Sequence, residues 1–337
     1  MIAAPTIVLA ADVGGTHTKV ALARFDAGAL ALIKREAYPS RTYASLELII
    51  ETFLREPEVN PYVGGIAAAC FAVAGPVEQG RARLTNLVWH VDEAVLGRHF
   101  PIPRMSVIND FAAAGLGIDH LGGSDVLTLQ EGTAVAHADR MVIGAGTGLG
   151  VAWLTWREGG YFVHPSEGGH ADFAPVDEIQ DELLMHLRRE FGRVSYERVL
   201  SGPGLPRIFD FLRQRAATAP AHALPDTAPG RDPAGIIAEL ALAKRDELAV
   251  RALDIFASAY GAFAGNMALL ALAHGGVYVA GGIAPKIAAK LNDGTFMRAF
   301  TAKGRLSSVL ETIPVKVVMN EQVGLLGALA EAARISS

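Results

Sequence analysis

Hydrophobic residues occur in short runs along this chain, separated by polar or glycine-rich turns. The first half has five runs of strand character, over residues 6–13, 19–25, 64–75, 81–89 and 104–110. An amphipathic stretch, SLELIIETFLRE (residues 45–56), has helical spacing and lies between two of them. Strands joined by a crossover helix predict a mixed α/β domain.

The second half repeats this start and then becomes helical. Its strand-like and then helical runs cover, in order, residues 138–146, 150–165, 178–192, 205–216 and 233–273. Residues 216–235 are rich in alanine and proline, which predicts a solvent-exposed excursion, and a closing helix is predicted over 324–335. The repeated strand–glycine–strand start is a weak internal repeat, compatible with two lobes of one topology.

Composition narrows the class of protein. The chain has 337 residues, 51% of them hydrophobic, which favours two domains with a sizeable core. A net charge of −5 and a pI near 6.1 make nucleic acid an unsuitable partner. The single cysteine, Cys70, lies in an apolar run and can form no internal disulfide, which fits a reducing cytoplasm.

No segment is predicted to leave the cytoplasm or cross a membrane. The opening MIAAPTIVLA lacks a basic region and runs into Asp12, so it is interpreted as a buried strand. Residues 255–273 are long enough to span a bilayer, yet they contain Asn266 and many small residues. A helix buried in a soluble protein is the better interpretation.

Three glycine turns carry the candidate chemistry: DVGGTHT (12–18), GAGTGLG (144–150) and VAGGIAPK (279–286). Backbone amides reach phosphate oxygens only where no β-carbon intervenes, so a nucleotide site needs glycine at such bends. None has the Walker A spacing, and the first is followed by a strand pattern rather than a helix. One such turn is usually an ordinary tight turn, but three in order favour a nucleotide site, in which the first two turns are predicted to be hairpins that hold phosphates.

At this point the chain resembles a known family. The ordered motifs DVGGTHTKVAL, VINDFAAAGLG, GAGTGLGVA, EGGHADFAP, ERVLSGPGL and GGVYVAGGIAPK are similar to those of the bacterial glucokinases, within the hexokinase, actin and Hsp70-like ATPase superfamily. The resemblance implies a two-lobed, actin-like (ribonuclease H-like) α/β fold, with a substrate cleft between a small and a large domain. It also implies Mg²⁺, ATP and glucose as ligands, and a cytoplasmic homodimer.

Asp110 is the candidate catalytic base. It stands where an apolar run ends and a small-residue helix begins, so it could project into a cleft or merely cap the helix. The residues alone leave these two roles open. The match to the family's "ND" motif favours the base that accepts the proton of the sugar hydroxyl, with Asn109 hydrogen-bonding the sugar.

The nucleotide is expected to bind at the glycine turns. Asp12 can hold Mg²⁺ through water, although it could also cap its turn. The expected nucleotide-binding residues are Asp12, Gly14, Gly15, Thr16, Lys19, Gly146, Thr147, Gly148, Gly281 and Gly282. The family often has asparagine and arginine where this chain has His17 and Lys19, which leaves the choice of phosphate donor open.

The sugar is expected to contact a polar, glycine-bent loop. By resemblance, Glu167, His170 and Glu197 bind sugar hydroxyls, with Asn86 in a further sugar-side loop. Trp89 beside it could equally be a core residue. The related repressor and kinase group follows its sugar-binding histidine with a cysteine-rich zinc motif, which this chain lacks, so no zinc is expected.

The resulting hypothesis is an ATP-dependent glucokinase that makes glucose 6-phosphate in the first step of glycolysis. A small domain is expected over residues 1–118, closed by a helix over 321–337, and a large domain over 119–320. Two alternatives stay open: a kinase for mannose, fructose or glucosamine, because epimers differ by one hydrogen bond, and a non-catalytic sugar-sensing relative. A DNA-binding module of the kind such regulators carry has no room before the first strand.

Overall fold

The chain forms two compact units. In the computed structural model, the residues described are 5–26, 28–84, 87, 89–215 and 232–336. Unit 1 contains the chain up to residue 121 together with 322–337, and unit 2 contains residues 122–321. The predicted excursion lies mostly outside the described residues, because 216–231 are not among them.

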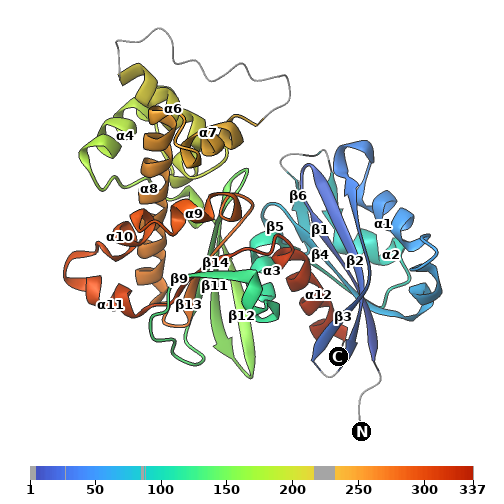
Figure 1. The fold of residues 1–337 in the computed structure, drawn as a ribbon. Helices are drawn as coiled ribbons and strands as arrows, with labels where there is room; N and C mark the ends of the chain where they lie inside the picture. Colours follow the sequence, from blue (N-terminus) through green and yellow to red (C-terminus); the bar gives the residue numbers. More distant parts are fainter. Residues whose placement is uncertain (1–4, 27, 85–86, 88, 216–231, 337) are drawn as a thin grey trace. The chain divides into compact units, whose positions relative to one another are not determined.

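Unit 1 is built on a five-stranded mixed sheet (Figure 1). Its strands, in spatial order, are β3 (Ala29–Pro39), β2 (His17–Asp26), β1 (Thr6–Val13), β4 (Ile66–Val73) and β8 (Arg104–Asn109). The hairpin strands β1, β2 and β3 pair antiparallel, whereas β1, β4 and β8 run parallel. The sequence analysis did not predict β3, whose side chains are mostly exposed.

Both faces of this sheet are covered, and β1 is apolar without alternation for that reason. Leu9 and Ala11 belong to a core shared with α1 (Leu46–Leu54) and α2 (Glu93–His99). Val8 and Ala10 point to the other face and pack on α12 (Val323–Ser336) and α3 (Asp110–Gly117). A β-carbon at Gly327 of α12 would lie 1.7 Å from the Ala113 carbonyl oxygen, so glycine permits this close helix contact.

A small three-stranded sheet completes unit 1. It consists of β5 (Val77–Glu78), β6 (Arg81–Arg83) and β7 (His90–Asp92), all antiparallel. The prediction of one strand over residues 81–89 is wrong, because the chain turns back after β6 and pairs with itself. Short strands of this kind leave too few alternating residues to be separated by pattern alone.

Unit 2 repeats the sheet of unit 1. Its strands, in spatial order, are β12 (Gly160–Ser166), β11 (Leu149–Arg157), β10 (Arg140–Ala145), β13 (Gly276–Ala280), β14 (Val315–Val318) and β9 (Val126–Gln130). An antiparallel hairpin followed by two parallel strands gives the same order and directions as in unit 1, with β9 added at the edge. The weak repeat seen in the sequence therefore corresponds to a repeated sheet topology.

Helices make up the rest of unit 2. They are α4 (Glu178–Phe191), α5 (Tyr196–Val199), α6 (Gly204–Arg215), α7 (Pro233–Leu242), α8 (Glu247–Ala271), α9 (Ala288–Leu291), α10 (Thr295–Thr301) and α11 (Ser307–Thr312). The single helix predicted over residues 233–273 is wrong. The chain breaks at Lys244, whose φ of 54° is left-handed, and Asp246 then caps the start of α8.

Helix α8 is the core helix of unit 2. It is the one described helix that passes a membrane-span test of length and hydropathy, but 67% of the qualifying window is buried inside the protein. Phe256, Tyr260 and Phe263 are among its fully buried side chains. The interpretation of this segment as a buried helix agrees with that packing.

Candidate active site

The first glycine turn joins β1 to β2 in unit 1. The Gly14 amide donates to the His17 carbonyl oxygen at 3.0 Å, and a β-carbon at position 14 would approach that oxygen to 2.9 Å. Ser40, from a single 3₁₀ turn (Ser40–Thr42), holds the hairpin by donating its hydroxyl to the Gly14 carbonyl oxygen at 2.7 Å. Gly15, Thr16 and Lys19 follow in the same turn and the start of β2.

Asp12 and Lys19 are direct neighbours on paired strands at the mouth of this turn. Burial raises the pKa of the Asp12 carboxyl, and the Lys19 ammonium opposes that rise. The first residues of α12 lie close by, since a β-carbon at Gly324 would be 3.6 Å from Asp12 Oδ2. The positive end of the α12 dipole and Lys19 both favour the charged carboxylate.

Asn109 and Asp110 stand at the junction of β8 and α3. The capping role considered for Asp110 belongs to Asn109, whose Oδ1 accepts from the amides of Phe111 at 2.9 Å and Ala112 at 3.1 Å. Asn109 Nδ2 also donates to the Gly75 carbonyl oxygen at 3.0 Å. Asp110 is the first residue of α3, half-buried, with Oδ1 accepting from the Phe111 amide at 2.9 Å. Asn109 therefore caps α3, and helix capping does not account for the presence of Asp110.

The second glycine turn joins β10 to β11 in unit 2. The Gly146 amide donates to the Gly148 carbonyl oxygen at 2.8 Å, and the Gly202 amide donates to the Gly146 carbonyl oxygen at 2.7 Å. Thr147 at the tip is exposed. This hairpin and the SGPG turn after α5 thus form one backbone network.

The third turn, at Gly281 and Gly282, packs on the base of the second. Gly281 has a φ of 83°, and a β-carbon there would lie 2.5 Å from the Ala145 carbonyl oxygen. The Ile283 amide donates to the same oxygen at 3.2 Å. Gly282 is exposed, with no atoms close to where a β-carbon would stand. The two turns predicted for the nucleotide in unit 2 are therefore neighbours.

Glu167, His170 and Glu197 converge in unit 2 as predicted for one polar loop. His170 Nε2 lies 3.7 Å from Glu167 Oε2, and His170 Nδ1 lies 3.9 Å from Glu197 Oε1. Glu167 and His170 flank the 3₁₀ turn η5 (Gly168–His170), and both side chains are exposed. A β-carbon at Gly169 would lie 1.9 Å from the Leu149 carbonyl oxygen, so this loop packs directly on β11.

Glu197 also contacts the second glycine turn. Its Oε2 accepts from the Leu149 amide at 3.1 Å, and a β-carbon at Gly148 would lie 2.5 Å from that oxygen. One carboxylate oxygen thus faces the second glycine turn while the other faces His170. A β-carbon at position 148 would therefore require the Glu197 carboxylate to move.

Two polar groups of α8, from the buried Tyr260 and the half-buried Asn266, support these elements. The Tyr260 hydroxyl accepts from the Ala145 amide at 3.0 Å, at the last residue before the second glycine turn. Asn266 donates its side-chain amide to the Tyr196 hydroxyl at 3.0 Å, next to Glu197 in the chain. Sequence reasoning missed both roles; the polar residues inside an apolar helix were the available signal.

Two predicted sugar-side residues have different outcomes. Asn86 lies outside the described residues. Trp89 is 4% exposed and belongs to the core of unit 1, which is the structural alternative considered for it.

The glucokinase family model matches residues 9–335. The chain belongs to the glucokinase family. A glucokinase of Nostoc sp. is 42% identical over 344 residues, covering 98% of this chain and all of the relative, and a glucokinase of Synechocystis sp. is 40% identical, covering 97% and 98%. The crystal structure of a glucokinase from an Antarctic psychrotroph aligns with a TM-score of 0.84 and 32% identity, covering 97% and 99% of the two chains.

The fold is shared more widely than the glucokinase sequence. A ROK family glucokinase from Streptomyces griseus, solved in complex with glucose and AMPPNP, aligns with a TM-score of 0.62 at 22% identity, covering 98% of this chain and all of that one. At that identity the likeness shows the fold alone. The α/β fold of this chain agrees with the predicted fold class. Its membership of the glucokinase family confirms the resemblance stated from the motifs.

The residues present fit the magnesium that glucokinases use with ATP. Asp12 offers one carboxylate beside an amide-lined turn, which suits an ion that keeps most of its waters and binds nucleotide phosphates. No cluster of three or more His, Cys, Asp or Glu residues suitable for a metal occurs within the described ranges, 5–26, 28–84, 87, 89–215 and 232–336. A protein-only metal cage is therefore not what this part of the chain offers.

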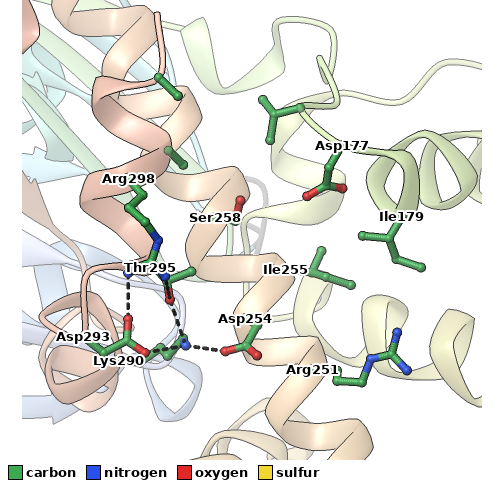
Figure 2. A pocket seen from close by; sticks show the side chains of 13 residues that line it. Asp177, Ile179, Arg251, Asp254, Ile255, Ser258, Lys290, Asp293, Thr295 and Arg298 are labelled. Carbon is green, nitrogen blue, oxygen red and sulfur yellow. Dashed lines mark hydrogen bonds and ion pairs between the residues drawn. The ribbon is translucent and has the colours of Figure 1, made fainter. Parts of the chain in front are cut away.

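A separate cavity of about 740 Å³ in unit 2 contains none of the predicted site residues. Figure 2 shows a charged cluster among its lining residues, in which Lys290 donates to Asp254, to Asp293 at 2.6 Å and to Thr295 at 3.2 Å. These groups satisfy one another and join α8 to the loop before α10. We interpret this charged cluster as a structural ion-pair network rather than the reaction site.

Proposed function

We propose that this member of the glucokinase family transfers the γ-phosphoryl group of Mg-ATP to the 6-hydroxyl of D-glucose. The observation that carries the proposal is the position of Glu197, whose two oxygens face the glycine turn at 146–148 and His170. A sugar held by Glu167, His170 and Glu197 would then lie beside a turn suited to phosphate.

The remaining roles follow the motifs residue by residue. Asp110 would accept the proton of the 6-hydroxyl, as phosphoryl transfer to an alcohol requires. The side-chain oxygen of Asn109 already accepts the hydrogen bond that caps α3. Only its side-chain NH2 group would therefore donate to the sugar. Asn86 remains a predicted sugar ligand. These residues belong to unit 1, and the proposal therefore includes a substrate cleft between the two units.

The nucleotide would be bound by all three glycine turns. Gly14, Gly15, Thr16 and Lys19 would face the phosphates from unit 1, and Asp12 would hold Mg²⁺ through water. The bound ion would neutralise the charge that develops on the phosphates. In unit 2 the phosphates would contact Gly146, Thr147 and Gly148, and adenosine would pack on Gly281 and Gly282. The tight backbone approach at Gly281 supports that last role.

The cellular setting belongs to the proposal as well. We propose a homodimer that acts in the cytoplasm at the first step of glycolysis, as the family resemblance implies. The fully buried Cys70, with its thiol pKa raised by burial, fits a reducing compartment in which no disulfide is needed.

The test is ATP-dependent phosphorylation of glucose, mannose, fructose and glucosamine by the purified chain and its Asp110→Asn variant. We expect glucose to be preferred, and Asp110→Asn to lower kcat about 100- to 10,000-fold with little change in glucose binding. Asp26→Asn, which alters an exposed aspartate in the same unit, is the matched control and should retain full activity.

Each alternative has its own result. Preference for another hexose would replace glucose as the substrate. Glucose binding by wild-type protein without phosphate transfer to any sugar would favour the sugar-sensing relative. Full activity of Asp110→Asn would remove the base assignment while leaving the reaction in place.

A further inference from the structure

A second cavity, of about 370 Å³, lies in unit 2 at the amino ends of the parallel strands. Its volume falls within the range typical of small-molecule sites. The residues that give it chemical character are His137, Arg140, Tyr161, Tyr278 and Lys316. None of them belongs to the proposed active site.

The charge of this cavity has one sign. His137, Arg140 and Lys316 line it, and no aspartate or glutamate is among the described residues of its wall. Asp139, which precedes Arg140 in the chain, accepts a hydrogen bond from the indole nitrogen of Trp153 at 2.9 Å and does not line the cavity. A low-dielectric recess lined by basic groups attracts anions.

Strand register places the key side chains on one face of the sheet. Tyr278 on β13 is paired with Lys316 on β14 and with Val142 on β10. Arg140 lies two residues before Val142 and therefore points to the same face. The Arg140 guanidinium carbon is 3.9 Å from the ring centroid of Tyr161 and 5.9 Å from that of Tyr278. Cation–π contacts of this kind orient the guanidinium.

The loop that forms the opposite wall is fixed in place. The Val135 amide donates to the His274 carbonyl oxygen at 3.0 Å, and the Tyr161 hydroxyl donates to the Ala138 carbonyl oxygen at 3.1 Å. The His137 ring stacks on Trp156, with 4.1 Å between centroids and 12° between planes. The cavity therefore exists before any ligand arrives.

This cavity is distinct from the proposed phosphate hairpin. Strand β10 begins at Arg140, in the cavity wall, and ends at Ala145, where the second glycine turn starts. Five residues of strand separate the two by about 17 Å. Ligands of open α/β sheets usually bind at the carboxyl ends of strands, so a site at the amino ends is an additional one.

We propose that this cavity binds a phosphate dianion, either free or as a small phosphomonoester. A guanidinium, an ammonium and an imidazole suit a doubly charged phosphate better than a single carboxylate, and arginine favours phosphate geometry. The Tyr161 and Tyr278 rings in the wall offer apolar surface for a compact organic group on the ester. Both inorganic phosphate and a sugar phosphate present this chemistry.

The experiment titrates glucose 6-phosphate, and separately inorganic phosphate, into the full chain by calorimetry, with glucose and AMPPNP saturating. Under these conditions the proposed sugar and nucleotide sites are occupied. We expect one saturable site per chain, weakened about tenfold by Lys316→Gln, which corresponds to about 1.4 kcal/mol for one charged contact. Lys244→Gln, an exposed lysine of the same unit outside the cavity, should bind like wild type.

A second variant and a fluorescence signal distinguish a loss of ligand binding from a loss of folding. Arg140→Lys keeps the charge but loses the fork, so it should also weaken binding. Trp156 fluorescence should change on titration, because the ring stacks on His137 in the wall. Tighter binding of glucose 6-phosphate than of phosphate would show that the organic group is also recognised; equal binding would identify the phosphate alone.

Absence of binding to the wild type, or equal binding to Lys316→Gln, would overturn the proposal. Equal millimolar binding of sulfate, unaffected by either variant, would mean nonspecific anion association and would also overturn it. Basal phosphorylation of glucose by Lys316→Gln should be unchanged, because this residue lies outside the proposed active site. Failure of this proposal therefore leaves the proposed function untouched.

Discussion

Asp12 places a carboxylate in a position that costs stability. Burial raises its pKa, so the native chain holds this proton more tightly than the unfolded chain does. Stability attributable to Asp12 is therefore lost as pH rises from the usual carboxyl range through the raised pKa. A buried carboxylate beside a turn proposed to bind phosphate is the kind of local cost in stability that function justifies.

Replacing this carboxylate should separate stability from activity. Asp12→Asn is expected to increase the free energy of unfolding of the ligand-free chain at pH 7, with a smaller gain toward pH 4. Activity with Mg-ATP should fall about 10- to 100-fold, as for loss of a group that orients a metal. Urea denaturation at both pH values and initial rates measure the two effects. A ligand-free variant less stable than wild type at pH 7 would contradict the burial argument.

The two glycines of the second turn should respond differently to alanine. Gly148→Ala would place a β-carbon 2.5 Å from Glu197 Oε2, whereas Gly146→Ala meets open space. Gly148→Ala should therefore weaken glucose binding in the absence of ATP about 10- to 100-fold, by displacing Glu197. Gly146→Ala is the matched control and should leave that binding unchanged. Equal glucose affinity of the two variants, measured by calorimetry, would argue against the link through Glu197.

At the scale of elements, α8 connects the core of unit 2 to the proposed site. Its apolar residues fill the core, while Tyr260 and Asn266 each hold a functional element by a hydrogen bond. The two contacts are separable, because Tyr260 supports the glycine turn and Asn266 supports Tyr196 beside Glu197. Because α8 is packed rigidly in the core, its two hydrogen bonds hold these elements of the proposed site in fixed positions.

Removing the hydroxyl group of Tyr260 or of Tyr196 should separate the two supporting roles of α8. Tyr260→Phe leaves the buried Ala145 amide without its acceptor, at a cost of about 1–3 kcal/mol, and should raise the KM for ATP more than the KM for glucose. Tyr196→Phe should show the reverse preference. Steady-state kinetics with either substrate varied, together with thermal melts, measures both. Equal losses of stability without opposite KM effects would reduce both residues to structural roles.

At the scale of the whole molecule, the proposal requires both units to respond to glucose. Hydrogen exchange with and without glucose should show slower exchange in residues 104–117 of unit 1 and in residues 166–199 of unit 2. The reason is that a ligand stabilises the segments it binds, by about 2.7 kcal/mol at 100 times its Kd. Strand β9 at the far edge of unit 2 is the internal control. Protection restricted to unit 2 would remove Asn109 and Asp110 from the sugar site.

Long apolar runs and glycine turns made much of the fold predictable. The strands β1 and β4, the helix α1 and the hairpins at both glycine turns follow from local pattern, because each satisfies its preferences within a few residues. The exposed strand β3 and the short strands β6 and β7 did not follow. Their conformation depends on pairing with distant partners, which hydrophobic spacing does not encode.

The sequence by itself determined the family, the order of the motifs and the identity of the polar residues near each turn, since these depend on residue types in series. Only the tertiary structure decided that Asn109 caps α3, that Glu197 contacts both Leu149 and the region of His170, and that Trp89 is core. Those outcomes depend on which groups compete for a hydrogen bond or for buried volume. For Glu197 and Trp89 the competing groups lie far apart in the chain, so the outcome is settled by packing and not by sequence spacing.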